Sequence, residues 1–131
     1  MIQRKELNFA GQDVFVALDV HKRNWQVAIM VNDMFHRTFR QDPRPSLLVN
    51  YLRRNFPGAR YHCVYEAGYC GFWIHDQLRT LGVDCMVTNP ADVPTTDKEK
   101  RTKTNKVDAR KLVRNLHNGE LAPVYVPNRS A

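Results

Sequence analysis

The sequence lacks the features that define several common classes of protein. Its 131 residues include three cysteines, Cys63, Cys70 and Cys85, and no pair of them has C-x-x-C spacing. We therefore expect neither a disulfide framework nor a structural zinc site. No apolar run approaches the roughly 18 residues that a membrane helix needs, and the first residues lack the apolar stretch of a signal peptide. These absences favour a cytoplasmic protein without a membrane partner.

Acidic residues are scarce relative to basic ones. The chain has 13 Asp and Glu against 20 Lys and Arg, so its formal net charge is +7. Such a balance favours a polyanionic partner, either nucleic acid or an acidic membrane surface. The basic residues are concentrated late in the chain, although a solvated loop and helix face would show the same pattern. They are Lys98, Lys100, Arg101, Lys103, Lys106, Arg110, Lys111 and Arg114.

Apolar periodicity predicts one α/β domain. Residues 1–13 are polar and predict a tail, and residues 14–127 hold the patterned segments. Short apolar runs and period-two runs predict strands, and 3.6-residue spacing between breakers such as Pro45 and Gly82 predicts helices. The predicted strands are 14–20, 24–31, 34–40, 61–65 and 83–88, with a short extended piece at 124–126. The predicted helices are 45–56, 72–81 and 105–118, and 89–104 is predicted to be a long loop.

The order of these elements indicates the architecture. Three strands joined by short turns predict an antiparallel meander, and the helices and strands that follow alternate. This order suits a mixed sheet with helices on both faces, and it resembles the ribonuclease H-like fold.

Three acids occupy the ends of predicted elements. Asp19 lies near the end of the first strand, Glu66 follows the fourth, and Asp108 lies in the first turn of the last helix. In the predicted fold these carboxylates converge at one edge of the sheet. Clustered carboxylates repel each other unless a cation is present, and Mg²⁺ prefers such oxygen ligands. A pair of Mg²⁺ ions can stabilise the attacking and leaving oxygens of phosphodiester chemistry.

Each acid also has a structural explanation. Asp19 could accept bonds from backbone amides, and Glu66 could simply be exposed. If Asn105 caps the last helix, Asp108 stands at its third position, where an acid favours the helix dipole.

Four short segments resemble one family in the order in which that family carries them. Segment 17–22, ALDVHK, resembles the GIDV-x-K opening of the DEDD insertion-sequence transposases and the related Piv-type DNA invertases. Segment 65–71, YEAGYCG, resembles their stretch around the second acid. Segment 103–109, KTNKVDA, is similar to their K-T-D-x-x-D-A stretch. Segment 123–127, PVYVP, resembles the VY-x-P stretch that closes their first domain.

The resemblance implies a RuvC-like catalytic domain over residues 14–127, in which four acids bind Mg²⁺ or Mn²⁺. Asp19 matches the first acid, Glu66 the second and Asp108 the fourth. Asn105 stands where the third is usually Asp, and its amide can offer a carbonyl oxygen but no charge. The implied activity is metal-dependent cleavage and transfer of DNA strands during transposition.

The resemblance also implies partners and a second domain. Family members act as oligomers on element ends and target DNA, with a guide RNA implicated for some. They carry a second, serine-bearing domain, which we expect this chain to lack, so we expect a poor recombinase on its own. Phosphate contacts are expected from basic side chains, which could instead be only solvated. The candidates are Lys22, Lys98, Arg101, Lys103, Lys106, Arg110 and Arg114.

Two other functions compete with this one. A non-catalytic nucleic-acid-binding or assembly module of the same fold is favoured by Asn105 and by the missing second domain. An actin-like or sugar-kinase-like nucleotide binder needs a glycine-bearing phosphate loop after the first strand. The segment from Val20 to Asn24 has no glycine, which argues against the nucleotide binder. Trp25 and Trp73 are expected in packing, whereas Tyr69 is more open to base stacking.

Overall fold

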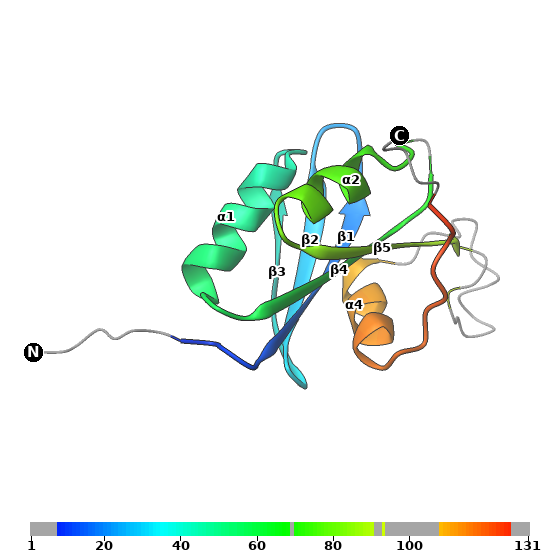
Figure 1. Ribbon diagram of the computed structural model, residues 1–131. Coiled ribbons are helices and arrows are strands. Elements are labelled where there is room, and N and C mark those ends of the chain that lie inside the picture. Colours follow the sequence, from blue (N-terminus) through cyan, green and yellow to red (C-terminus); the bar gives the residue numbers. More distant parts are fainter. Residues whose placement is uncertain (1–7, 69, 91–92, 94–107, 127–131) are drawn as a thin grey trace, which may run out of the picture.

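The computed structural model describes residues 8–68, 70–90, 93 and 108–126, and its centre is a five-stranded sheet (Figure 1). The strand order is β3-β2-β1-β4-β5. Neighbours β1, β2 and β3 pair antiparallel, whereas β1, β4 and β5 pair parallel. The strands are β1 (Asp13–Val20), β2 (Trp25–Val31), β3 (Met34–Gln41), β4 (Arg60–Glu66) and β5 (Asp84–Thr88). The helices are α1 (Pro45–Asn55), α2 (Trp73–Thr80) and α4 (Ala109–His117).

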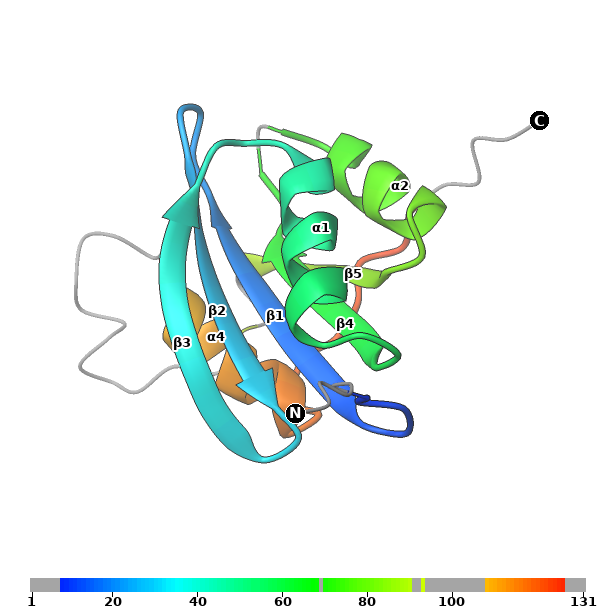
Figure 2. The same ribbon diagram turned by 90° about the vertical axis from the view of Figure 1, so that its left-hand side faces the viewer.

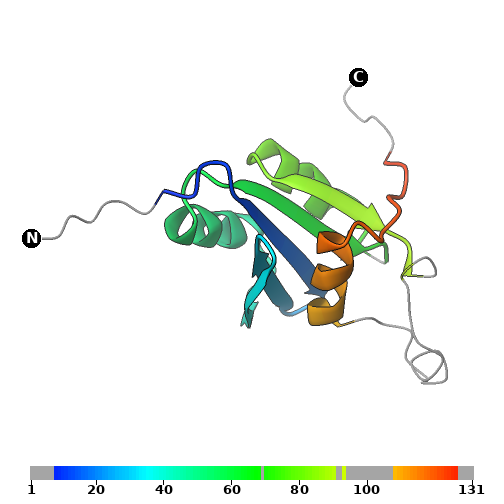
Figure 3. The same ribbon diagram turned by 90° about the horizontal axis from the view of Figure 1, so that it is seen from below.

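Helices cover both faces of the sheet. Figure 2 shows α1 and α2 in front of the strands and α4 behind them, and Figure 3 shows the same layers from below. The layer under α1 and α2 includes Leu18, Trp25 and Tyr65, all buried. The layer under α4 is built from smaller side chains such as Ala17 and Ala28. This arrangement confirms the predicted mixed sheet of the ribonuclease H-like fold.

Alternation along β1 explains why its sequence is almost continuously apolar. Val16 and Leu18 belong to the layer under α1 and α2, and Ala17 belongs to the layer under α4. A strand buried on both faces needs apolar residues at every position. The alternation also assigns a face to each later residue, so Asp19 lies on the face of α4.

Helix α4 runs against the direction of β1 (Figure 1). Its last residue, His117, packs its ring against Phe15 near the start of β1, with ring centroids 5.2 Å apart. Its first residue, Ala109, is buried in the layer that contains Ala17 and Ala28. The first turn of α4 is therefore directed toward the end of β1 that bears Asp19.

Several predicted boundaries agree with the structure. Pro45 opens α1 at its first position, where its missing N–H costs nothing. Gly82, with φ of +94°, turns the chain after α2, a conformation that L side chains rarely adopt. The extended piece at 124–126 lies beside β5, because the Val124 N–H donates to the Val87 carbonyl at 2.7 Å. Among the described helices, none is long and apolar enough to cross a membrane.

The packed structure begins before residue 14. Asp13 is already the first residue of β1. The Phe9 ring meets Phe56 edge-on at 5.3 Å, and the Phe9 N–H donates to the Pro57 carbonyl at 2.9 Å. Residues 8–13, which the polar composition assigned to a tail, are thus part of the domain. An aromatic anchor explains this difference.

Strand β3 departs from the predicted simple alternation. Met30 pairs with Phe35, but the preceding residue Ile29 pairs with Arg37, so His36 is an extra residue in the ladder. Phe35 therefore lies on the face of α4 while Arg37 lies on the face of α1. Regular alternation along 34–40 would place both side chains on one face, but the bulge shifts the alternation by one residue.

Candidate functional site

Asp19 and Glu66 lie at the ends of neighbouring parallel strands. The last register pair between β1 and β4 joins Leu18 to Tyr65, so Asp19 and Glu66 follow one residue later on each strand. Two residues earlier, Ala17 pairs with Val64, and both lie in the layer under α4. Both carboxylates therefore share that face, on strands about 4.8 Å apart. The structure brings these two predicted residues together.

Burial makes this pair of acids electrostatically unusual. The Asp19 side chain is only 13% exposed, and its Oδ2 lies 3.2 Å from Nε2 of His21. Asp19 Oδ1 and Glu66 Oε2 are both buried from solvent. Neighbouring carboxylates that have lost water repel each other, and a nearby cation relieves that repulsion. A bound cation would relieve the repulsion within this pair.

Tyr65 anchors the chain beside Glu66 from the opposite face. Its hydroxyl donates to the Gly71 carbonyl at 2.9 Å and accepts the His75 N–H at 3.2 Å. Burial raises the pKa of Tyr65 above its usual value, which keeps this hydroxyl protonated as a donor. Beyond Glu66, the Ala67 N–H donates to the Thr88 carbonyl at 2.7 Å. The backbone around Glu66 is thus held by both α2 and β5.

Asp108 has a different local role from the one predicted. It is the N-cap of α4, and its side chain accepts the Lys111 N–H at 3.0 Å. The predicted helix 105–118 has Asp108 in its first turn, whereas α4 begins at Ala109 and Asp108 directly precedes it. Aspartate in extended conformation is itself a preferred cap, because its carboxylate satisfies a free amide of the first turn.

The structure does not show Asp108 joined to the acid pair. Asp108 is exposed and bonded to its own helix. Asn105 lies outside the described residues. Within 8–68, 70–90, 93 and 108–126, no group of three or more His, Cys, Asp or Glu side chains is arranged to hold a metal.

The donor set of the pair nevertheless fits a hard divalent cation. Carboxylate oxygens are the ligands that Mg²⁺ prefers, and Mg²⁺ keeps several waters, so one or two protein carboxylates can bind it. Two of the cysteines, Cys63 and Cys85, are buried on the other side of the sheet, in the layer under α1 and α2. Asp19 and Glu66 are thus the described residues suited to Mg²⁺ or Mn²⁺.

The described basic candidates lie on the same face or at the same end. Lys22 is exposed in the turn between β1 and β2, close in sequence to Asp19. Arg110 and Arg114 of α4 place their guanidinium groups 4.7 and 5.9 Å from the Phe35 ring centroid. Phosphate contacts were also predicted for Lys98, Arg101, Lys103 and Lys106, which lie outside the described residues.

The two tryptophans pack together, as the sequence predicted. Trp25 is fully buried, and Trp73 packs near it with ring centroids 6.4 Å apart, although 42% of Trp73 is exposed. Tyr69, the candidate for base stacking, lies outside the described residues.

Sequence reasoning missed two polar residues beside the acids. Gln26 pairs with Asp19 across β1 and β2, and Arg40 pairs with Gln26 across β2 and β3. Directly opposed residues lie on the same face of a sheet. Counting back from the hairpin turn would have found Gln26, whereas the face of Arg40 follows from its register beyond the bulge.

Comparisons with known proteins point to mobile DNA elements. No protein-family model matches the chain. The chain is 32% identical over 114 residues to a protein of Sinorhizobium fredii named as the transposase y4rJ, covering 79% of this chain and 29% of that protein. It is 31% identical over 104 residues to the transposase for insertion sequence element IS1533 of Leptospira borgpetersenii, covering 77% and 30%.

A solved structure and the lengths of the relatives complete the comparison. The large terminase nuclease of a thermophilic phage is 13% identical with a TM-score of 0.40, covering 58% of this chain and 42% of that one. The chain spans less than a third of the length of the curated relatives that it matches. The similarity to these relatives supports a relationship between this chain and the transposases of insertion sequences.

Proposed function

We propose that this chain is the metal-dependent DNA-processing domain of an insertion-sequence transposase, of the RuvC-like DEDD type. The observation that carries the proposal is the juxtaposition of Asp19 and Glu66 on one face, at the ends of adjacent parallel strands. The transposase relatives and the net charge of +7 support DNA as the substrate.

In this proposal Asp19 and Glu66 bind Mg²⁺ or Mn²⁺, and Asp108 and Asn105 complete the ligand set when DNA and metal are present. A divalent ion in such a site activates the attacking oxygen and stabilises the charge that develops on the leaving oxygen. His21, 3.2 Å from Asp19 Oδ2, orients that carboxylate. Tyr65 holds the backbone that carries Glu66.

Basic side chains around the acids position the phosphate backbone. Lys22 is exposed at the end of the sheet where Asp19 lies, and Arg110 and Arg114 extend from α4 over Phe35. Such contacts fix orientation rather than sequence preference. In the same role we propose Lys98, Arg101, Lys103 and Lys106.

A second candidate function is a non-catalytic nucleic-acid-binding or assembly module. Two observations favour it: Asn105 carries no charge, and no third acid lies with Asp19 and Glu66 among the described residues. In that case the basic surface binds DNA electrostatically and the acids serve only the fold.

A metal titration distinguishes the two. The melting temperature of the chain is measured with increasing Mg²⁺ or Mn²⁺. At ten times the dissociation constant, the metal should raise it by about 5 °C. Asp19→Asn should abolish the rise. The matched control Asp33→Asn, which changes an exposed acid in the turn between β2 and β3, should keep it.

The competing outcome is equally specific. In that outcome, millimolar metal does not change the melting temperature, and DNA binding depends steeply on salt but is unchanged by Asp19→Asn. Together these results would establish the non-catalytic module.

The remaining predictions concern partners, oligomeric state and a second domain, and they apply to the full-length protein. Action on element ends and target DNA, the homo-oligomer, the guide RNA and the serine-bearing second domain come from the family resemblance alone. They stay predictions for the full-length protein, as does the weak activity of this part on its own.

A further inference from the structure

A row of polar side chains crosses the sheet at the level of the two acids. Asp19 is paired with Gln26, Gln26 with Arg40, and Glu66 with Thr88. Paired residues share a face, and Asp19 and Glu66 share the face of α4, so the whole row lies there. From β3 to β5 its members are Arg40, Gln26, Asp19, Glu66 and Thr88.

Among the residues that the structure describes, the row is covered at one end and open at the other. Thr88 is fully buried, and its hydroxyl donates to the Ala122 carbonyl at 3.0 Å. Pro123 forms an isolated bridge with Thr88, so the chain near the C-terminus covers this end. At the other end Gln26 is half-buried and Arg40 is exposed on the edge strand. A ligand therefore reaches the acids over β2 and β3.

The N-terminus of helix α4 lies just before the row of polar side chains. Ala109 begins the helix and is buried with Ala17 and Ala28, which lie two residues before Asp19 and two residues after Gln26. The small side chains let the helix approach the sheet closely at that level. The polar row is the next level along the strands, beyond the first turn of α4.

The side chains of Gln26 and Arg40 have no polar partner among the described residues. In the described part of the chain, neither the Gln26 amide nor the Arg40 guanidinium makes a hydrogen bond or an ion pair. By contrast, Arg37 on the opposite face of the same strand lies over the Phe39 ring at 5.3 Å. A half-buried amide and a guanidinium aligned with two carboxylates have donors available for a ligand.

We propose that Gln26 and Arg40 are substrate-positioning residues that hold a backbone phosphate of the DNA strand as it crosses β3 and β2 toward Asp19 and Glu66. This inference rests on the proposed function. Guanidinium binds phosphate oxygens through two parallel N–H donors, and the amide NH₂ of glutamine adds a neutral donor. Their positive and neutral donors offset the repulsion between the DNA phosphates and the two acids.

The first test measures DNA affinity of the chain as a function of salt. Arg40→Ala should reduce the slope of log K against log salt by about 0.9, and lower the affinity about eightfold at 0.1 M salt. The matched control is Arg37→Ala, which removes the same charge from the opposite face of β3 and should have a clearly smaller effect. Arg40→Lys should restore most of the slope, because the charge remains.

The second test separates hydrogen bonding from charge. Gln26→Ala should lower DNA affinity about two- to tenfold without changing the salt slope. The control Gln77→Ala, at an exposed position of α2, should leave affinity unchanged. Melting temperatures of all four alanine variants should stay close to that of the parent, which excludes a merely structural effect.

The outcomes separate this inference from the proposed function. Equal effects of Arg40→Ala and Arg37→Ala, with a preserved metal-induced rise in melting temperature, would overturn the phosphate path alone. Loss of the metal response in the parent chain would overturn the proposed function, and with it the role of the row in presenting DNA to a metal site. A strong Arg40 effect with an intact metal response supports both.

Discussion

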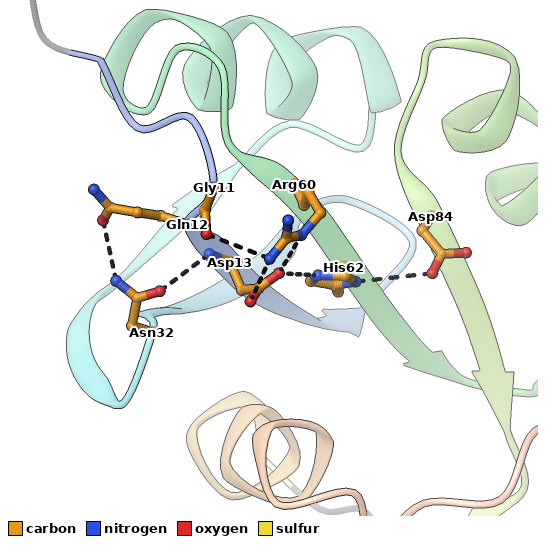
Figure 4. Close-up of polar contacts among 7 residues, drawn as sticks. All are labelled: Gly11, Gln12, Asp13, Asn32, Arg60, His62 and Asp84. Atoms are coloured by element: carbon orange, nitrogen blue, oxygen red, sulfur yellow. Dashed lines mark hydrogen bonds and ion pairs between the residues drawn. The ribbon is translucent and has the colours of Figure 1, made fainter.

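The two ends of β1 both carry buried or half-buried acids, but their neighbours differ. At the start, Asp13 accepts from Arg60 Nε at 2.8 Å and lies 2.9 Å from Nε2 of His62 (Figure 4). Asp84 of β5 lies 3.8 Å from the other nitrogen of His62. At the end of β1, Asp19 has a second acid, Glu66, on the neighbouring strand. At the start of β1, the acid pairs with a basic side chain and helps to fix the strand register. At the end of β1, two neighbouring acids suit the metal ligand proposed above.

The electrostatics at the start of β1 support a structural role there. The bond from Arg60, and after it the bond from His62, holds the pKa of Asp13 well below its usual range. Arg60 is also the register partner of Asp13 on β4. These contacts match β1 to β4 at one end, so the same register brings Asp19 beside Glu66 at the other.

The largest expected effect is a loss of stability when a core side chain of β1 is truncated. Leu18 is buried beneath α1 and α2, directly before Asp19. Leu18→Ala should lower the free energy of unfolding by about 2–5 kcal/mol, because it deletes buried methyl groups and leaves a cavity. Urea unfolding measures the change. Leu47→Ala, at a partly exposed position of α1, is the control and should cost far less.

The next effect concerns only the end with the paired acids. Tyr65→Phe removes the hydroxyl that joins Gly71 to His75 and should destabilise the protein by about 1–3 kcal/mol, since two part-buried partners each lose a hydrogen bond. It should also weaken the metal-induced rise in melting temperature, because Glu66 is less firmly held. Tyr125→Phe, at an exposed side chain, serves as the control. An unchanged metal response would show that Tyr65 stabilises α2 without positioning Glu66.

A smaller effect separates the two roles of Asp108. Asp108→Ala should cost about 1 kcal/mol through loss of the helix cap. Asp108→Ser keeps a capping oxygen but loses the carboxylate, so stability should recover while the proposed metal response stays reduced. Thermal unfolding with and without Mn²⁺ measures both. If Asp108→Ser responds to metal like the parent chain, Asp108 is a cap and not a ligand.

Much of this fold could be predicted because its determinants are local. Short apolar runs and alternating runs located all five strands of the sheet, and Pro45 and Gly82 marked helix boundaries that the structure confirms. The bulge at His36 could not be predicted, because it depends on how β3 pairs with β2. The packing of Phe9 on Phe56 likewise joins segments that are distant in sequence.

The site shows the same division. The strand ends carrying Asp19 and Glu66 follow from sequence pattern and topology together, and the structure places them side by side. The exact start of α4 depends on a competition between two capping residues, Asn105 and Asp108, which sequence does not decide. Gln26 can be placed opposite Asp19 by counting from the hairpin turn, whereas the face of Arg40 is known only from the register of β3 beyond the bulge.

The smallest expected effect tests the structural end by pH. The pKa of Asp13 is lowered in the folded chain, so its ionised form contributes stability above about pH 4. That contribution is lost as pH falls from about 4 through the lower folded value, because the carboxyl takes up a proton and releases Arg60. Asp13→Asn should therefore be slightly less stable at neutral pH and should approach the parent chain in acid.

The measurement is the melting temperature from pH 7 to pH 2, and the control is Asp42→Asn, at an exposed acid outside this network. The difference should be small, since exposed ion pairs contribute little. The metal-induced rise in the melting temperature of Asp13→Asn should match that of the parent chain, because Asp13 lies at the opposite end of β1 from Asp19. Asp13→Asn could instead lose the metal response and keep the acid-sensitive part of its stability. That result would reverse the roles assigned to the two ends of β1, because Asp13 would then belong to the metal site.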